Sequence, residues 1–268
     1  MAKAVALLFW CTLLIAQSGE ARKHFLNGVG LYGEHDDSGD ALREAQQEFA
    51  AALRLAPTYA APRAYQGLIA LEENRDAEAR IAFQEALAWD RNCAEALVGL
   101  ARLSQRKGTT RETLTLQRQA VAAAPRNALA RRELASTLTN ENNQNLPPTP
   151  AMWQEAIESW RVLITIDRND RDAHYDLARA YRKFNRWSEA EHEFREVLRI
   201  GQTPEDSDVW VYTVHGELAE VLAKQGKNAR AIRQYEALIA SDGAGDEEIR
   251  RAREAIAVLR RSLVRPRP

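Results

Sequence analysis

The chain has 268 residues, of which 45% are hydrophobic and 28% are charged, and its formal net charge is −1. This composition is that of a globular protein with enough apolar residues for a sizeable core. The nearly balanced charge argues against proteins that bind nucleic acid or an anionic membrane through a strongly basic surface, so we expect no nucleic-acid partner.

Residues 1–18 have the pattern of a secretory signal peptide. Lys3 precedes an apolar run from Ala4 to Ile15, and Ala16 and Ser18 supply small side chains at the positions that a signal peptidase inspects. The run is shorter than the roughly 20 residues that cross a bilayer. We therefore predict cleavage and a periplasmic or secreted protein. Because Arg22 and Lys23 follow, a retained membrane anchor stays open as the alternative.

A small residue returns along the chain with a period of 34 residues that is lengthened in two places. A second small residue and then a large side chain follow it in each repeat, with Gln117 as the exception to the large one. The first small residues are Gly33, Gly67, Ala101, Ala135, Ala178 and Ala219, and the large residues are Phe49, Phe83, Trp160, Phe194 and Tyr235. Such a period predicts a protein built from repeats of one structure.

Each repeat has the apolar spacing of two helices. In the third repeat, Leu97, Leu100 and Leu103 recur every three residues, which is a helical spacing and not the alternation of a strand. Neither helix can bury its apolar stripe alone, so consecutive helix pairs must stack. We predict thirteen helices after residue 18, two in each of six repeats and one at the C-terminal end, and no strands.

This register resembles the tetratricopeptide repeat (TPR). The small eighth residue of the family falls on the Gly and Ala set above, its apolar seventh on Leu100, Leu134, Leu177 and Leu218, and its closing Pro on Pro57 and Pro125. The Trp of the family's first helix is missing throughout. The resemblance covers residues 22–245 and implies an all-α fold, an α-solenoid of about six helix-turn-helix repeats that binds other proteins.

The resemblance also implies a binding groove, because the first helices of successive repeats line the concave face in that family. Carried over position by position, it assigns to the groove of repeats three to five Arg102, Arg106, Arg132, Tyr175, Arg179, Arg182 and Lys183. Arginine forks suit carboxylates, so we expect an acidic extended or helical segment of a partner protein. An ordinary solvated helix face is the alternative interpretation of these charges.

Two insertions and a terminal helix complete the pattern. The first insertion falls at residues 140–150, where a run of Asn and Pro cannot continue a helix and predicts a projecting loop. The second lies at 201–208, between repeats five and six. Residues 246–264 place apolar side chains on one face and arginines on the other, which predicts a capping helix.

We find no pattern of a catalytic, cofactor or metal site. The sequence lacks a glycine-rich phosphate loop, paired cysteines and the histidine pair of a metalloprotease. His174 and His192 are expected at the surface or in the groove, and Cys93 is expected to be buried and inert. We predict no enzyme and no cofactor.

The most consistent function is a secreted or periplasmic adaptor that holds a partner segment in its concave groove and helps to assemble a larger envelope complex. A second hypothesis is a membrane-tethered accessory subunit, retained by residues 4–15 and bound to its complex through its convex face and the 140–150 loop.

Overall fold

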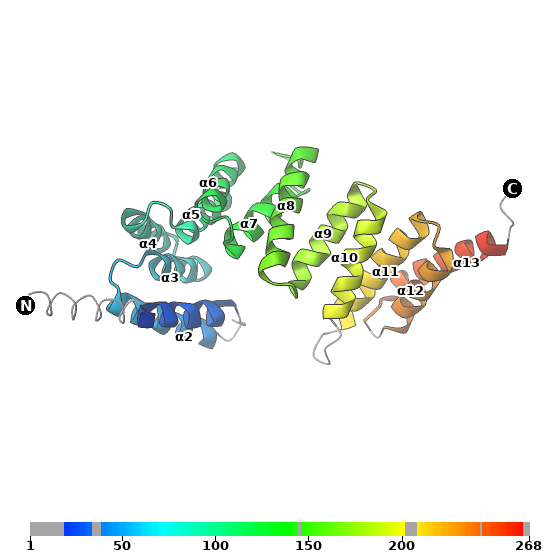
Figure 1. Ribbon diagram of the computed structural model, residues 1–268, viewed down its shortest axis with the longest axis horizontal. Coiled ribbons are helices and arrows are strands. Elements are labelled where there is room, and N and C mark those ends of the chain that lie inside the picture. The colour runs from blue at the N-terminus through cyan, green and yellow to red at the C-terminus, as the bar shows by residue number, and fades with distance from the viewer. Residues whose placement is uncertain (1–18, 34–38, 144–145, 202–207, 242, 265–268) are drawn as a thin grey trace, which may run out of the picture. The chain divides into compact units, whose positions relative to one another are not determined.

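The computed structural model describes residues 19–33, 39–143, 146–201, 208–241 and 243–264, so the expected signal segment at 1–18 lies outside the described residues. Within these ranges the chain forms thirteen helices and no strand, as predicted (Figure 1). None of the described helices is both long enough and apolar enough to cross a bilayer.

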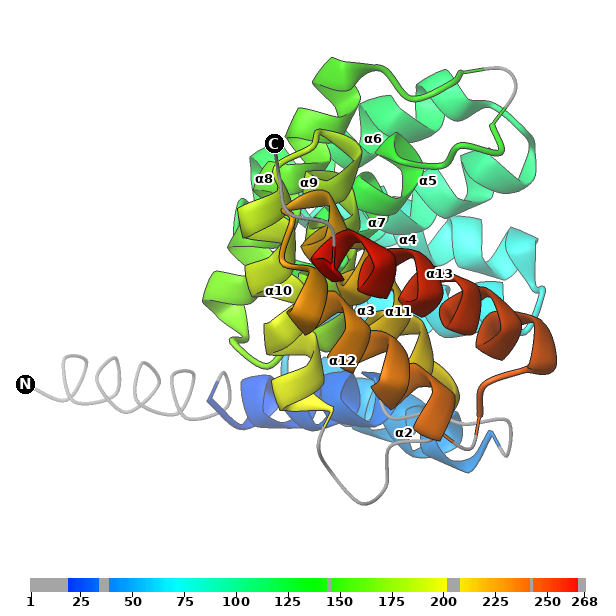
Figure 2. The same ribbon diagram turned by 90° about the vertical axis from the view of Figure 1, so that its right-hand side faces the viewer.

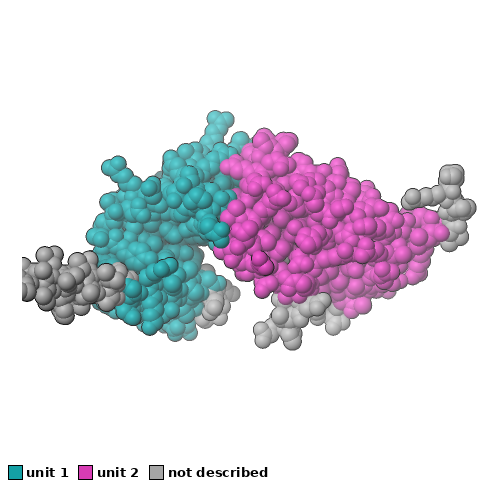
Figure 3. Space-filling view, viewed as in Figure 1, with its two compact units in different colours: residues 1–148 teal, residues 149–268 magenta. Residues whose placement is uncertain are grey.

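The helices fall into two compact units, residues 1–148 and 149–268 (Figure 3). The N-terminal unit holds the helix over residues 19–33, α2 (Asp40–Leu55), α3 (Ala60–Glu72), α4 (Asp76–Trp89), α5 (Ala94–Arg106), α6 (Thr110–Ala123) and α7 (Ala128–Leu138). The C-terminal unit holds α8 (Pro150–Ile166), α9 (Arg171–Lys183), α10 (Trp187–Ile200), α11 (Asp208–Lys224), α12 (Asn228–Ala240) and α13 (Asp246–Val264). The division therefore falls inside the fourth predicted repeat, at the first insertion.

Helices pack in the order that a stacked repeat requires. The two helices of a repeat pack on one another in the pairs α3/α4, α5/α6, α9/α10 and α11/α12. The first helix of a repeat also packs on the second helix of the repeat before it, in the pairs α4/α5, α6/α7, α8/α9 and α10/α11. Apolar stripes inside a stack are thus covered from two sides, and the core follows the order of the helices.

Four of the five predicted large side chains lie in this core, namely Phe49, Phe83, Trp160 and Phe194, and Tyr235 is half-buried. Phe49, Phe83 and Phe194 are fully buried. A Cβ placed on Gly67 would lie 2.6 Å from the Phe83 ring, and one on Gly99 would lie 2.1 Å from it. The Phe83 ring therefore occupies the space that a side chain at either glycine would need, which explains why these positions are glycine.

The register of the first repeat differs from the prediction. Gly33 is exposed, and a Cβ on it would meet no atom within 4 Å. Gly28 takes its place instead, since a Cβ there would lie 2.6 Å from the Phe49 ring, as at Gly67 and Phe83. The spacing between the described helices is also wider here: the first helix is described to residue 33 and α2 begins at Asp40, whereas α3 and α4 are separated by residues 73–75.

One turn joins the two helices in four repeats. At the same register position, the backbone is left-handed at Asn74, Gly108, Asn185 and Gly226, with φ of 60°, 75°, 57° and 74°. The next residue returns its N–H to a carbonyl of the last helical turn, as from Thr109 to Ser104 at 3.2 Å. This bond defines a Schellman motif, which favours Gly or Asn at the left-handed residue.

The insertions fall in connections between helices. Residues 139–143 and 146–149 contain turns and no helix, and the Thr149 side chain accepts the N–H of Met152 to begin α8 with Pro150 in its first turn. The second insertion lies between Ile200 and Asp208, and its residues 202–207 are outside the described part. At the C-terminal end, α13 packs on α12 (Figure 2).

Candidate partner-binding surface

The seven predicted groove residues are divided between the two units. Arg102 and Arg106 lie on α5 and Arg132 lies on α7, all in the N-terminal unit. Tyr175, Arg179, Arg182 and Lys183 lie on α9 in the C-terminal unit. In each unit, we call the side formed by the first helices of the repeats the first-helix surface: residues 19–33, α3, α5 and α7 in the N-terminal unit, and α9 and α11 in the C-terminal unit.

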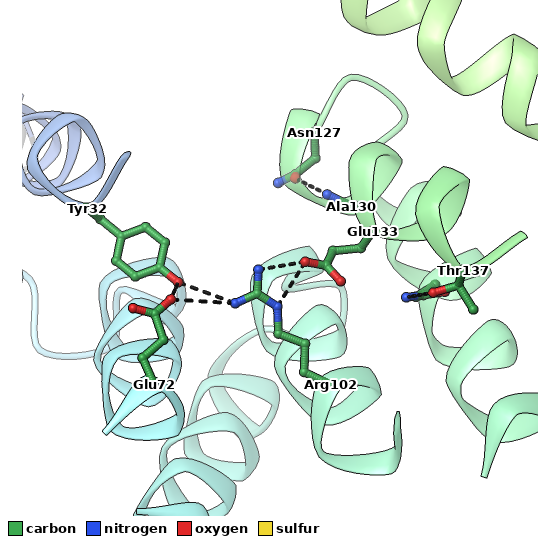
Figure 4. A network of polar contacts seen from close by, with 8 residues as sticks. Tyr32, Glu72, Arg102, Asn127, Ala130, Glu133 and Thr137 are labelled. Carbon is green, nitrogen blue, oxygen red and sulfur yellow. Dashed lines mark hydrogen bonds and ion pairs between the residues drawn. The ribbon is translucent and has the colours of Figure 1, made fainter. Parts of the chain in front are cut away.

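Arg102 lies at the centre of a polar network that crosses four first helices (Figure 4). Its Nε and Nη2 atoms donate to one oxygen of Glu133 on α7 at 2.9 and 2.6 Å. Its Nη1 atom lies 3.4 Å from the Tyr32 hydroxyl and 3.8 Å from Glu72 of α3. Tyr32 donates to the same oxygen of Glu72. The guanidinium thus joins consecutive repeats and is largely engaged inside the molecule.

The electrostatics of this network follow from burial and pairing. Burial opposes the charge on Arg102, but the Glu133 carboxylate and the Tyr32 hydroxyl together outweigh it and raise the pKa of the guanidinium above its ordinary value. Burial, together with the hydrogen bond to Glu72, raises the pKa of Tyr32. The arginine therefore stays charged and the tyrosine stays neutral over the physiological range.

Arg106 is also held by the protein. Its Nη1 atom lies 2.6 Å from an oxygen of Asp76, at the start of α4, and its Nη2 atom donates to the carbonyl of Leu71 at 2.7 Å. The side chain is about one-third exposed, with 38% of its surface accessible. Arg106 therefore links α5 to the end of α3 and the start of α4, and part of its side chain stays exposed.

In the C-terminal unit, Arg182 and Tyr175 meet two carboxylates of α11. Arg182 donates to Glu220 at 3.0 Å and lies 3.6 Å from Glu217, and the Tyr175 hydroxyl lies 3.5 Å from Glu217. Burial raises the pKa of the Glu217 carboxyl above its ordinary value and raises that of Tyr175 to about 12. These contacts again join two consecutive first helices.

Besides Arg106, three of the predicted cations are exposed: Arg132 on α7, and Arg179 and Lys183 on α9. The guanidinium of Arg179 lies 5.7 Å from the centre of the Tyr175 ring, and the Lys183 ammonium lies 4.9 Å from that of Trp153 on α8. Aromatic rings attract cations placed over their faces, so these two side chains are positioned while their charged ends remain accessible.

The predicted groove residues did not include the carboxylates on this surface. Glu72, Glu133, Glu217 and Glu220 offset part of the positive charge that the predicted set alone would carry. Glu220 occupies in repeat six the register position that Arg179 occupies in repeat five, so extending the groove positions by one repeat would have found it. Glu133 lies outside those positions, and only the structure places it beside Arg102.

Two other side chains with reactive groups, Cys93 and His174, are buried among the packed helices. Cys93 is buried, as predicted, and burial raises the pKa of its thiol to about 12. His174 was expected at the surface or in the groove, but it is buried: its Nδ1 lies 2.6 Å from Glu193 and its Nε2 lies 3.3 Å from the Arg168 carbonyl. Among the residues with described positions, no three His, Cys, Asp or Glu side chains are grouped to hold a metal ion.

Comparison with known proteins supports the same fold. A family model described as tetratricopeptide repeat matches residues 151–212, which include α8, α9 and α10. The predicted resemblance to this repeat is confirmed by that match and by solved TPR structures. No sequence among characterised proteins matches the chain at a significant level.

Three solved structures illustrate the similarity. YrrB, a TPR protein with an unusual peptide-binding site, is 15% identical with a TM-score of 0.57, over 77% of this chain and 97% of YrrB. The human IFIT1 dimer with m7Gppp-AAAA is 21% identical with a TM-score of 0.53, over 93% of this chain but 56% of IFIT1. A mutant of MamA is 15% identical with a TM-score of 0.51, over 66% of this chain and 93% of MamA. At such identities the similarity shows a TPR-like solenoid fold and no more.

Proposed function

We propose that this protein is an adaptor that binds a segment of a partner protein on its first-helix surfaces, and that it works by binding and not by catalysis. The observation that carries the proposal is the arrangement of charge in both units. In each unit, exposed cations share the first-helix surface with arginines that are paired with carboxylates of neighbouring first helices. A surface whose side chains are already ordered loses less entropy when a partner binds.

We further propose that the partner segment is acidic. Arg132 in one unit, and Arg179 and Lys183 in the other, supply the accessible positive charge. Arg102 and Arg182 stabilise the packing of neighbouring first helices, because Glu133 and Glu220 already accept some of their hydrogen bonds. An acidic segment would pair with the exposed cations, so the complex should weaken as salt concentration rises.

The proposed location is the periplasm or the exterior, with the adaptor helping to assemble a larger envelope complex. The support is the sequence pattern of residues 1–18 alone. Sequencing the N-terminus of the mature protein tests it: a chain that begins near residue 19 supports export with cleavage. An intact N-terminus in a membrane fraction supports the tethered accessory subunit instead.

The binding surface is tested by charge reversal. We expect the Arg132→Glu, Arg179→Glu double variant to capture less partner from an envelope extract and to associate more slowly with the identified partner segment. Neither side chain is buried, so the helical circular dichroism signal should persist.

The matched control is Arg118→Glu with Arg233→Glu, which reverses two exposed arginines on the second helices α6 and α12. This control should keep partner capture. Equal losses in both variants would mean a general charge effect, and full capture by the first variant would place the binding site elsewhere.

A further inference from the structure

Two open cavities occupy the same place in the repeat register, one in each compact unit. Both lie where two second helices flank a first helix: α2 and α4 beside α3 in the N-terminal unit, and α8 and α10 beside α9 in the C-terminal unit. The equivalence follows from the register, because Phe83 and Phe194 occupy the same position in α4 and α10. Their volumes are about 340 and 510 Å³.

The two cavities differ in chemistry. The wall formed by the first helix carries Gln66 and Ala70 in the N-terminal cavity, and Leu177 and Tyr181 at the equivalent positions of the C-terminal cavity. Ile164 of α8 adds to the apolar lining of the second one. Side chains of this kind form sites for apolar groups, so the cavity lined by α8, α9 and α10, the α9 cavity, has the character of an anchor site.

Opposite charges flank the apolar lining of the α9 cavity. Arg161 lies on α8 and Glu189 lies on α10, and their side chains are 54% and 46% exposed. Arg161 is paired with Glu158, and Glu189 with Arg186, each within its own helix or at its start. Exposed pairs of this type are worth little, so both residues can exchange their partners for those of an incoming segment.

The chain itself carries a segment that complements this pattern. Val258 and Leu263 on α13 are large apolar side chains that remain 58% and 55% exposed. Glu254 precedes Val258 by four residues and Arg261 follows it by three, so the three side chains share one face of the helix. Along that face an acidic, an apolar and a basic residue follow one another. The α9 cavity offers the complementary set, a basic residue, an apolar lining and an acidic residue.

We propose that the α9 cavity receives α13 of a second copy of this chain, with Val258 against Leu177 and Tyr181, Glu254 near Arg161, and Arg261 near Glu189. The inner face of α13 carries the buried residues Ala252 and Ile256, and the helix packs on α12 (Figure 2). Val258 is exposed, which leaves its face of the helix for the second copy. This contact is independent of the first-helix surfaces and goes beyond the function proposed above.

Each copy offers one α13 and one α9 cavity. Two copies that exchange α13 reciprocally about a twofold axis form a closed dimer, whereas copies that bind head to tail form rings or open chains. The area around one helix face is small, so we expect association that grows with protein concentration over the range used for sedimentation.

Sedimentation velocity of the full chain at increasing concentration tests the proposal. The unmodified protein should form dimers and larger species. Val258→Glu on α13 and Ile164→Glu in the cavity should each return it to a monomer. The matched control is Ile81→Glu in the N-terminal cavity, where Ile81 is also exposed and occupies the register position of His192. This control should associate as the unmodified protein does.

Charge reversal identifies the pairing. Arg161→Glu and Glu254→Arg should each weaken association alone, while a mixture of the two variants should associate again, because both junctions between unlike copies pair an arginine with a glutamate. Circular dichroism confirms that each variant is folded. The proposal is overturned if the unmodified chain is a monomer throughout, if Ile164→Glu dissociates the assembly while Val258→Glu does not, or if the mixture forms no dimer.

Discussion

At the scale of single residues, the predicted groove arginines have two different roles. Arg102 and Arg182 are bound by carboxylates on neighbouring first helices, whereas Arg132 and Arg179 are exposed. Sequence register could place all four on first helices, because it reports the face of a helix. It could not separate the two roles. An arginine that stabilises the fold and an arginine that contacts a partner differ only in whether the neighbouring helix places a carboxylate beside the guanidinium.

The support role of Arg102 predicts a loss of stability. Arg102→Met keeps much of the side-chain volume but leaves Glu133 and Glu72 without their cation, and these carboxylates are only 20% and 26% exposed. Losing charged hydrogen bonds at such a site should cost about 1.5–3 kcal/mol of unfolding free energy. Urea unfolding should show a lower midpoint with an unchanged slope.

The control for this prediction is Arg43→Met. Arg43 pairs with Asp40 one turn away on α2, and both side chains are highly exposed. Its loss should change the unfolding free energy by less than about 0.5 kcal/mol. Similar effects in the two variants would show that the Arg102 network adds nothing beyond an ordinary surface pair.

At the scale of elements, most of the fold could be predicted from the sequence because helices and their stacking depend on local spacing. The thirteen helices and the burial of Phe49, Phe83 and Phe194 followed from the register. The first repeat was misaligned because Gly33 fits the 34-residue period, while Gly28, which packs on Phe49, precedes Gly67 by more than one period. A fixed period cannot detect added residues when a second glycine stands where the period expects one.

The recurring Schellman turn gives a prediction about Gly108, because equivalent turns in the same protein carry Asn at that position. Gly108 has φ of 75°, and the equivalent residues Asn74 and Asn185 have φ of 60° and 57°. Gly108→Ala should therefore lower the unfolding free energy by about 1–2 kcal/mol, because Cβ opposes the left-handed conformation. Gly108→Asn should lose less, since Asn tolerates this conformation at two equivalent turns.

Thermal unfolding followed by circular dichroism measures both Gly108 variants. Gly30→Ala is the control, because Gly30 lies in a helix and a Cβ on it would meet no atom within 4 Å. That substitution should raise stability by up to about 1 kcal/mol. If Gly108→Asn were as damaging as Gly108→Ala, backbone strain would not be the cause.

At the scale of the whole molecule, repeats contact only their neighbours, so each end needs a terminal element that covers an apolar face. The packing of α13 on α12 places it in this role at the C-terminal end. Ala231 and Ile232 of α12 are buried, as are Ala252 and Ile256 of α13. Without α13, the apolar face of α12 would meet water as one contiguous patch.

Deleting residues 246–268 should therefore lower the soluble yield and raise light scattering, because soluble monomers rarely expose large contiguous apolar patches. The Ile256→Asp variant makes the same test without shortening the chain: a carboxylate forced into the α12–α13 contact should loosen the helix and produce a weaker effect in the same direction. Val258→Glu is the control, since Val258 is exposed and its replacement leaves that contact intact. A truncated protein as soluble and as monodisperse as a full-length Val258→Glu variant would mean that α13 does not cap the repeats.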